Sequence, residues 1–124
     1  PALIRHGTEA QKKEFMPDLL NCRSSWCTGY SEPDVGSDLG SLKLRAVKDG
    51  DDYVINGSKI WTTKAHVAKN IFLTVRTNPE AESRYRGISV LLTPMETEST
   101  GPQFSQGRKA RAGRRRGSAQ DCTL

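Results

Sequence analysis

The stretch LKLRAVKDGDDYVING, residues 42–57, decides the fold class. Its first five residues alternate between apolar and charged side chains, which is the pattern of a strand with one buried face. Asp49-Gly50 is typical of a turn, and residues 52–55 are typical of a returning strand. The stretch therefore predicts two strands joined by a tight turn.

Further strand signals lie on the C-terminal side of this pair. Asn56-Gly57 favours a second hairpin, because a type I′ turn needs positive φ at both central residues, and we expect a third strand at residues 58–63. Apolar runs predict a fourth strand at residues 70–76 and a fifth at residues 87–93. Short connections between successive strands predict a mainly β fold, an antiparallel meander or barrel-like domain rather than a parallel nucleotide-binding sheet.

A short helical segment precedes the strands. Thr8 and Gln11 have the spacing of a capping box, in which each side chain bonds the backbone N–H of the other. Good helix formers follow, and we expect Pro17 to kink or restart the helix because it has no backbone N–H. Residues 1–22 are therefore predicted to be helical and to support the structure rather than carry chemistry.

The charge of the chain is concentrated towards its C-terminus. The 124 residues are enough for one modest domain and carry a net charge of +5. Residues 1–100 hold 13 basic and 13 acidic residues, whereas residues 101–124 hold six basic residues and one acidic residue. That last stretch is poor in apolar side chains, so we expect residues 99–124 to form a disordered basic tail. A small β-protein that binds nucleic acid through this tail is an alternative, which the neutral body does not favour.

Several classes of protein and site are excluded by what the sequence lacks. No apolar run approaches the roughly 20 residues of a membrane-spanning helix. Three cysteines without a C-x-x-C pair give no sign of a zinc site or a disulfide framework, and His6 and His66 lack metal-ligand spacing. Glu32 and Asp34 are close enough to form paired acids, but charges at a turn are usually solvated, and Cys27 is expected to be a small strand residue. We expect a cytoplasmic protein without membrane contact, or a mitochondrial matrix protein in a eukaryote.

Two segments combine residue types that suit a polar, planar ligand. Residues 26–38 surround a Pro-containing turn with hydroxyls and glycines, which can present close backbone amides to a ligand. Residues 59–64, if extended, place Trp61 and Thr63 together on one face, and a flat aromatic surface beside a hydroxyl suits a heteroaromatic partner. Taken singly, an ordinary surface turn and a tryptophan packed in the core are the simpler interpretations.

Taken together, the two segments resemble the acyl-CoA dehydrogenase family. Residues 30–38 resemble its T/S-E-P-x-x-G-S-D signature, and residues 56–63 resemble its N-G-x-K-x-W-I/T-T segment. Residues 7–17 resemble the end of its N-terminal helical domain, and residues 86–92 resemble a later strand of its β-domain. Four matches in the family's order make the resemblance specific.

The resemblance implies a flavin site. Family members oxidise an acyl-CoA thioester to the trans-2-enoyl-CoA while FAD accepts a hydride. The implied cofactor-binding residues are Thr28, Gly29, Tyr30, Ser31, Ser37, Trp61, Thr62 and Thr63. The first four would line the flavin through backbone groups and the Ser31 hydroxyl, and Ser37 would also lie near the thioester or pantetheine of the substrate. Trp61 would pack on the isoalloxazine, and Thr63 would bond near its reactive nitrogen.

The resemblance also implies what the chain lacks. Residues 1–22 correspond to the end of the helical domain and residues 23–98 to the middle β-domain, whereas residues 99–124 match neither. The family's catalytic glutamate belongs to a later helical domain, so we expect no catalytic base here and no turnover by this chain alone. An intact relative would use an acyl-CoA substrate, pass electrons to electron-transfer flavoprotein and form a homo-oligomer. Acyl-CoA oxidases and flavin monooxygenases of the same architecture are alternatives, and an out-of-frame reading of a GC-rich gene would explain the tail.

Overall fold

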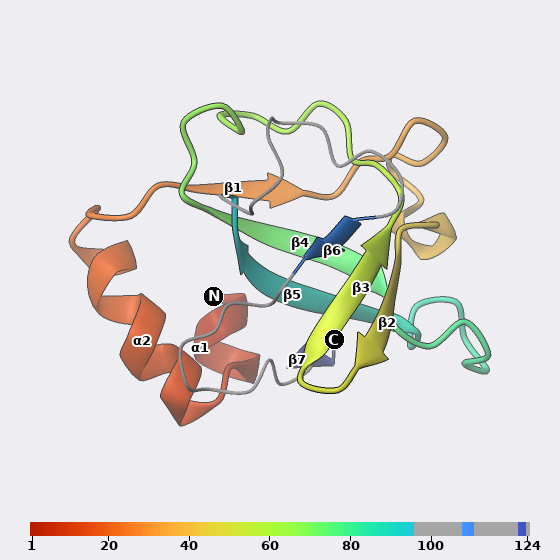
Figure 1. The fold of residues 1–124 in the computed structure, drawn as a ribbon, viewed down its shortest axis with the longest axis horizontal. Coiled ribbons are helices and arrows are strands. Elements are labelled where there is room, and N and C mark those ends of the chain that lie inside the picture. The colour runs from red at the N-terminus through yellow and green to blue at the C-terminus, as the bar shows by residue number, and fades with distance from the viewer. Residues whose placement is uncertain (96–107, 111–121, 124) are drawn as a thin grey trace.

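The protein is mainly β, as the sequence predicts. The computed structural model describes residues 1–95, 108–110 and 122–123. The elements, in chain order, are α1 (Ala2–His6), α2 (Glu9–Leu20), β1 (Trp26–Gly29), the short 3-10 helix η1 (Leu39–Ser41), β2 (Arg45–Asp49), β3 (Asp52–Asn56), β4 (Asn70–Arg76), β5 (Ile88–Pro94), β6 (Arg108–Ala110) and β7 (Cys122–Thr123). In Figure 1 the two helices lie at one end of the curled sheet, and the β2–β3 hairpin crosses in front of β4 and β5.

Strand β4 organises the sheet. It pairs antiparallel with β5 over its whole length, from Asn70 opposite Pro94 to Arg76 opposite Ile88. Its other edge pairs first with β1 and then, at Arg76, with the start of β2, and both of these pairings are parallel. The sheet is therefore mixed rather than a purely antiparallel meander. The parallel β1–β4 pairing brings the end of β1 beside the middle of β4. The candidate site lies at this end of β1.

The core lies where the β2–β3 hairpin faces β4 and β5. Alternate residues of β4 point into it, because successive side chains of a strand point to opposite faces. Leu73 and Val75 are fully buried there. The core cluster consists of Cys27, Leu44, Ala46, Tyr53, Ile55, Ala68, Ile71, Leu73, Val75 and Leu91. The prediction that Cys27 is a small strand residue is confirmed, and its side chain is buried.

The first hairpin is confirmed and the second is wrong. Strands β2 and β3 are joined by a tight turn in which Gly50 has φ +63°, and Asp49 lies opposite Asp52. The expected strand at residues 58–63 is absent, because the chain leaves the sheet after β3. Gly57 has φ +136°, and a Cβ there would lie 3.0 Å from the Leu44 Cα, so this glycine permits a close backbone approach instead of a type I′ turn.

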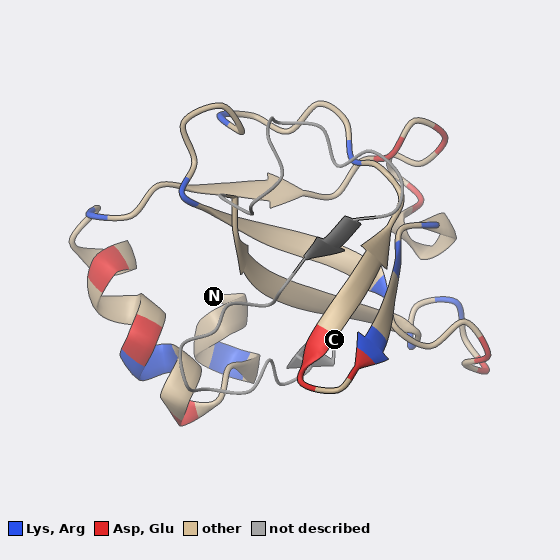
Figure 2. Cartoon of the chain, in the orientation of Figure 1, with Lys and Arg blue, Asp and Glu red and all other residues tan. Residues whose placement is uncertain are grey.

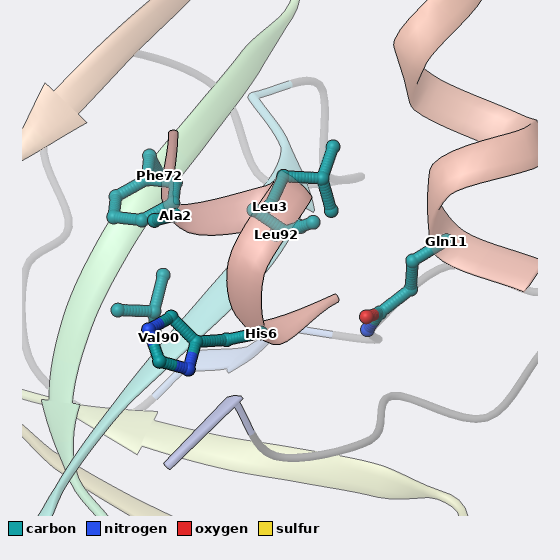
Figure 3. Close-up of a pocket in the computed structure, with 7 residues that line it drawn as sticks. All are labelled: Ala2, Leu3, His6, Gln11, Phe72, Val90 and Leu92. Atoms are coloured by element: carbon teal, nitrogen blue, oxygen red, sulfur yellow. The ribbon is translucent and has the colours of Figure 1, made fainter. Parts of the chain in front are cut away.

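The helical segment begins as predicted and differs further along. Thr8 and Gln11 form the full capping box at the start of α2. Pro17 does not restart the helix, which runs unbroken from Glu9 to Leu20. Residues 2–6 form an additional helix, α1. Figure 3 shows α1 beside a mostly apolar pocket, lined by Ala2, Leu3, His6, Gln11, Phe72, Val90 and Leu92.

Five residues of the predicted tail take part in the sheet. Strand β6 pairs antiparallel with β3, and β7 pairs antiparallel with β5. The outer edges of β3 and β5 offer backbone N–H and C=O groups to a further strand, and this pairing does not depend on apolar side chains. The expected disorder concerns the other residues of 99–124, which lie outside the described residues.

Charged residues are few on the two central strands β4 and β5. Figure 2 shows basic and acidic residues along the helices, the loops and the end of the β2–β3 hairpin, with β4 and β5 nearly free of them. In the part of the chain that the structure describes, no helix is long and apolar enough to cross a membrane.

Candidate functional site

The two segments singled out in the sequence meet in the structure. The backbone N–H of Ile60 donates to the carbonyl oxygen of Ser31 at 2.9 Å. One residue earlier in each segment, the Lys59 ammonium donates to the carbonyl oxygen of Tyr30, also at 2.9 Å. The segment after β3 thus lies along the end of β1, although 29 residues separate Tyr30 from Lys59.

A buried ion pair lies beneath this junction. Lys59 Nζ and Glu32 Oε1 are 2.9 Å apart, and their side chains are only 2% and 5% exposed. The Glu32 carboxylate also accepts from the backbone N–H groups of Lys43 at 2.7 Å and Leu44 at 3.0 Å. Since Glu32 is held by three donors from two other segments, the prediction that it is a solvated turn residue is wrong.

Thr74 of β4 completes the cluster. Its hydroxyl accepts from Lys59 Nζ at 3.2 Å and donates to the carbonyl oxygen of Gly29 at 3.0 Å. Lys59 therefore directs its ammonium to three oxygens, those of Tyr30, Glu32 and Thr74. Burial lowers the pKa of Lys59 below its usual range, and the hydrogen bond and charge of Glu32 oppose that shift.

The middle of the signature at residues 30–38 forms a turn between Glu32 and Val35. The two residues exchange backbone hydrogen bonds of 2.7 and 3.1 Å around Pro33 and Asp34. Asp34 is exposed and pairs with Lys43 at 3.1 Å. Ser37 follows this turn as an exposed residue.

A second charged group follows the turn at the surface. The Asp38 carboxylate accepts from the Ser41 hydroxyl and pairs with Arg84 at 2.9 Å. The bond from Ser41, more than the nearby Arg84, lowers the pKa of Asp38. These contacts hold the end of the signature against the loop before β5.

Trp61 stands on the surface in a strained backbone conformation. Its side chain is 87% exposed and its φ is +55°, a left-handed value that is uncommon outside glycine. Lys64 also has a left-handed φ, of +61°. Because the segment is not a strand, the prediction that Trp61 and Thr63 share a face by alternation has no basis. What the structure shows instead is a large aromatic ring presented to solvent beside the end of β1.

The remaining predicted site residues are mostly accessible. Thr28, Tyr30 and Thr63 are exposed, and Ser31 and Thr62 are half-buried. The Tyr30 ring meets Phe72 of β4 edge to face, with ring centres 6.3 Å apart. Gly29 is buried, and a Cβ there would lie 2.9 Å from side-chain atoms of Ile71 and Leu73.

Sequence reasoning missed the three residues that join the segments. Glu32 and Lys59 belong to the two motifs, whereas Thr74 lies in a strand without any motif. The sequence did contain a signal for Glu32 and Lys59. Their two motifs were expected to bind one ligand and therefore to lie close together, and opposite charges in neighbouring segments can form an ion pair. Thr74 had none, because only the parallel β1–β4 pairing brings it to Gly29.

Comparison with known proteins decides the family. The model of the acyl-CoA dehydrogenase middle domain matches residues 27–123. This chain belongs to the acyl-CoA dehydrogenase family. The matched range continues past residue 98, where the resemblance was expected to end.

Relatives agree in sequence and in structure. Acyl-CoA dehydrogenase FadE29 of Mycobacterium tuberculosis is 48% identical over 92 residues, which are 74% of this chain and 24% of the relative. The Tcur3481-Tcur3483 steroid ACAD is 47% identical, with a TM-score of 0.75 over 79% of this chain and 25% of that one. A glutaryl-CoA dehydrogenase from Mycobacterium smegmatis, solved in complex with FADH2, is 33% identical, with a TM-score of 0.67 over 78% of this chain and 23% of that one. The chain thus spans about a quarter of the length of these relatives.

Proposed function

We propose that this chain is the flavin-binding middle domain of an FAD-dependent acyl-CoA dehydrogenase. The observation that carries the proposal is the junction of the two motifs, which holds an exposed Trp61 beside the accessible end of β1. A left-handed backbone conformation at a non-glycine residue is found more often at ligand-binding and active sites than elsewhere, which supports a functional role for the Trp61 segment. We refer below to the longer protein that contains this domain as the full-length enzyme.

The residues at the junction fit a flavin. Trp61 offers a flat apolar face for the isoalloxazine, and Thr63 offers an exposed hydroxyl two residues further on. The carbonyl oxygens of Gly29, Tyr30 and Ser31 already accept hydrogen bonds within the protein, so the backbone of β1 is fixed before any ligand binds. When bound, FAD supplies the capacity to accept a hydride from the acyl chain, and the protein supplies binding and orientation.

The substrate would meet this domain at the exposed turn after β1. Ser37 is accessible there for the thioester or pantetheine of an acyl-CoA. The base that removes the α-proton belongs, on this proposal, to a part of the full-length enzyme beyond this chain, so the chain alone has no dehydrogenase activity. Electron-transfer flavoprotein is the proposed acceptor, and the full-length enzyme is proposed to be an oligomer, as the ChsE4-ChsE5 complex among its relatives is an assembly.

The acyl group is proposed to be bulky and of the steroid type. Identity to the steroid ACAD is 47%, against 33% for the glutaryl-CoA dehydrogenase over a similar part of the chain. Turnover of a CoA ester with a steroid side chain, measured against glutaryl-CoA in the full-length enzyme, tests this choice of substrate.

Replacing the exposed tryptophan tests the flavin site. Trp61→Ala in the full-length enzyme removes the stacking face. We expect the favourable free energy of FAD binding to fall by about 1 kcal/mol, which raises the dissociation constant about fivefold. Tyr85→Ala, which removes another exposed aromatic side chain from the loop between β4 and β5, is the control and leaves binding unchanged. Equal FAD affinity in the wild type and Trp61→Ala would contradict the proposed site.

A further inference from the structure

A buried polar cluster lies directly under the proposed flavin site, and no step of the proposed function uses it. It consists of Glu32, Lys59 and Thr74. Glu32 follows Ser31 in the chain, and Lys59 precedes Trp61 by two residues. Each charged residue of the cluster is therefore within two positions in the chain of a residue that is proposed to contact the flavin.

We propose that Glu32, Lys59 and Thr74 are positioning residues that set the geometry of the flavin site by fixing the Trp61 segment against the end of β1. The inference rests on the proposed function, because it concerns the same site. The three residues do not touch the ligand in this account, and they act through Tyr30 and the segment that carries Trp61.

The contacts of Lys59 support this role. Its ammonium donates to the Tyr30 carbonyl oxygen just after β1, the Glu32 carboxylate of the turn and the Thr74 hydroxyl of β4, at 2.9, 2.9 and 3.2 Å. One side chain thus ties its own segment to residues 26–38 and to β4. A lysine side chain is flexible on its own, but three hydrogen bonds restrict its conformation. Because the Lys59 side chain is held in this way, the backbone of the residues that follow it is also held in place.

The cost of burying two charges indicates that the pair has a purpose beyond stability. Taking an ion pair out of water costs several kcal/mol per ion, and apolar residues of similar volume often stabilise a fold as well or better. Three other ion pairs among the described residues, Lys12–Glu9, Lys43–Asp34 and Arg84–Asp38, each have at least one partner that is well exposed. The Glu32–Lys59 pair differs because both partners are buried and because both lie in segments of the proposed site.

Two variants of the full-length enzyme separate positioning from stability. Thr74→Val keeps the shape of a fully buried side chain and removes the hydroxyl that joins Lys59 to Gly29. The double variant Glu32→Gln, Lys59→Met removes both charges together and so leaves no unpaired charge in the interior. Thr93→Val is the matched control, since Thr93 is another buried threonine of the sheet whose hydroxyl bonds only the adjacent Pro94 carbonyl oxygen, at 3.5 Å, among the described contacts.

The readouts are the FAD dissociation constant, the visible circular dichroism of bound flavin and the flavin midpoint potential, each at a temperature where far-UV circular dichroism shows a folded protein. We expect Thr74→Val and the double variant to weaken FAD binding about tenfold, which corresponds to about 1.4 kcal/mol, and to change both the spectrum and the potential. Thr93→Val is expected to match the wild type in all three. If the double variant does not fold, Thr74→Val decides the question alone.

Two results would overturn the inference, and they differ from failure of the proposed function. Wild-type affinity, spectrum and potential in Thr74→Val and in the double variant would show that the cluster only stabilises the fold. Equal changes in Thr93→Val would show that any buried threonine of the sheet has the same effect. A wild-type enzyme that binds no FAD would refute the proposed function itself, and this inference with it.

Discussion

Replacing Glu32 by glutamine is expected to destabilise the protein more than its small change in shape suggests. The carboxylate accepts from three donors, the N–H groups of Lys43 and Leu44 and the ammonium of Lys59, at 2.7, 3.0 and 2.9 Å. Glutamine has one acceptor oxygen, so its NH2 group must face one of these donors. It also leaves the Lys59 ammonium buried without a counter-charge. Loss of one partner of a buried pair costs about 3–5 kcal/mol, and we expect that loss in the free energy of unfolding.

The neighbouring Asp34→Asn variant is the matched control. Asp34 lies two residues along the same turn and pairs with Lys43 at 3.1 Å, but the two side chains are 73% and 71% exposed. An exposed pair of this kind contributes about 0–1 kcal/mol. Urea unfolding followed by far-UV circular dichroism gives both values, provided that the slopes against urea agree. A loss below about 1 kcal/mol for Glu32→Gln, or one equal to that of Asp34→Asn, would refute the argument that an ionised Glu32 is buried.

Three further predictions concern the fold around the site. Gly57→Ala is expected to cost more than about 1 kcal/mol because of its φ of +136°, whereas Gly36→Ala, where a Cβ would meet no atom within 4 Å, changes the urea midpoint little. Burial raises the pKa of the Cys27 thiol, so at pH 8 iodoacetamide is expected to label the exposed Cys22 faster than Cys27, and equal rates by peptide mass spectrometry would contradict the packing of β1. The lowered pKa of Lys59 means that the unfolded chain binds more protons than the folded protein between that value and the ordinary 10.5. The wild type should therefore gain stability relative to Lys59→Met as pH rises through this window and lose the gain as pH falls, and the opposite slope would contradict the sign of the shift.

The regular parts of the fold were predictable because local patterns and the tertiary structure agree there. Strand β4 has the predicted bounds, and β5 is displaced by one residue, to Ile88–Pro94. The capping box of Thr8 and Gln11 depends on residues within one turn, so the sequence contains all of its determinants. The Asp49-Gly50 turn is local in the same sense.

The predictions failed where distant contacts override local preference. Asn56-Gly57 is a strong hairpin signal, yet the bonds of Lys59 to Tyr30, just after β1, and to Glu32 take the segment out of the sheet. The parallel β1–β4 pairing joins residues more than 40 positions apart, which no local pattern encodes. The motifs therefore located the candidate site, whereas Lys59, Glu32 and Thr74, which hold it together, became apparent only from the three-dimensional arrangement.

Hydrogen exchange of the full-length enzyme, with and without added FAD, tests whether the flavin binds where the two motifs meet. We expect FAD to slow exchange of the backbone amides of residues 28–31 and 61–63. The loop of residues 78–86, between β4 and β5, serves as the internal reference and is expected to exchange at the same rate in both samples. Slower exchange confined to other parts of the enzyme, with residues 28–31 and 61–63 unchanged, would contradict the assignment of the flavin site to this junction.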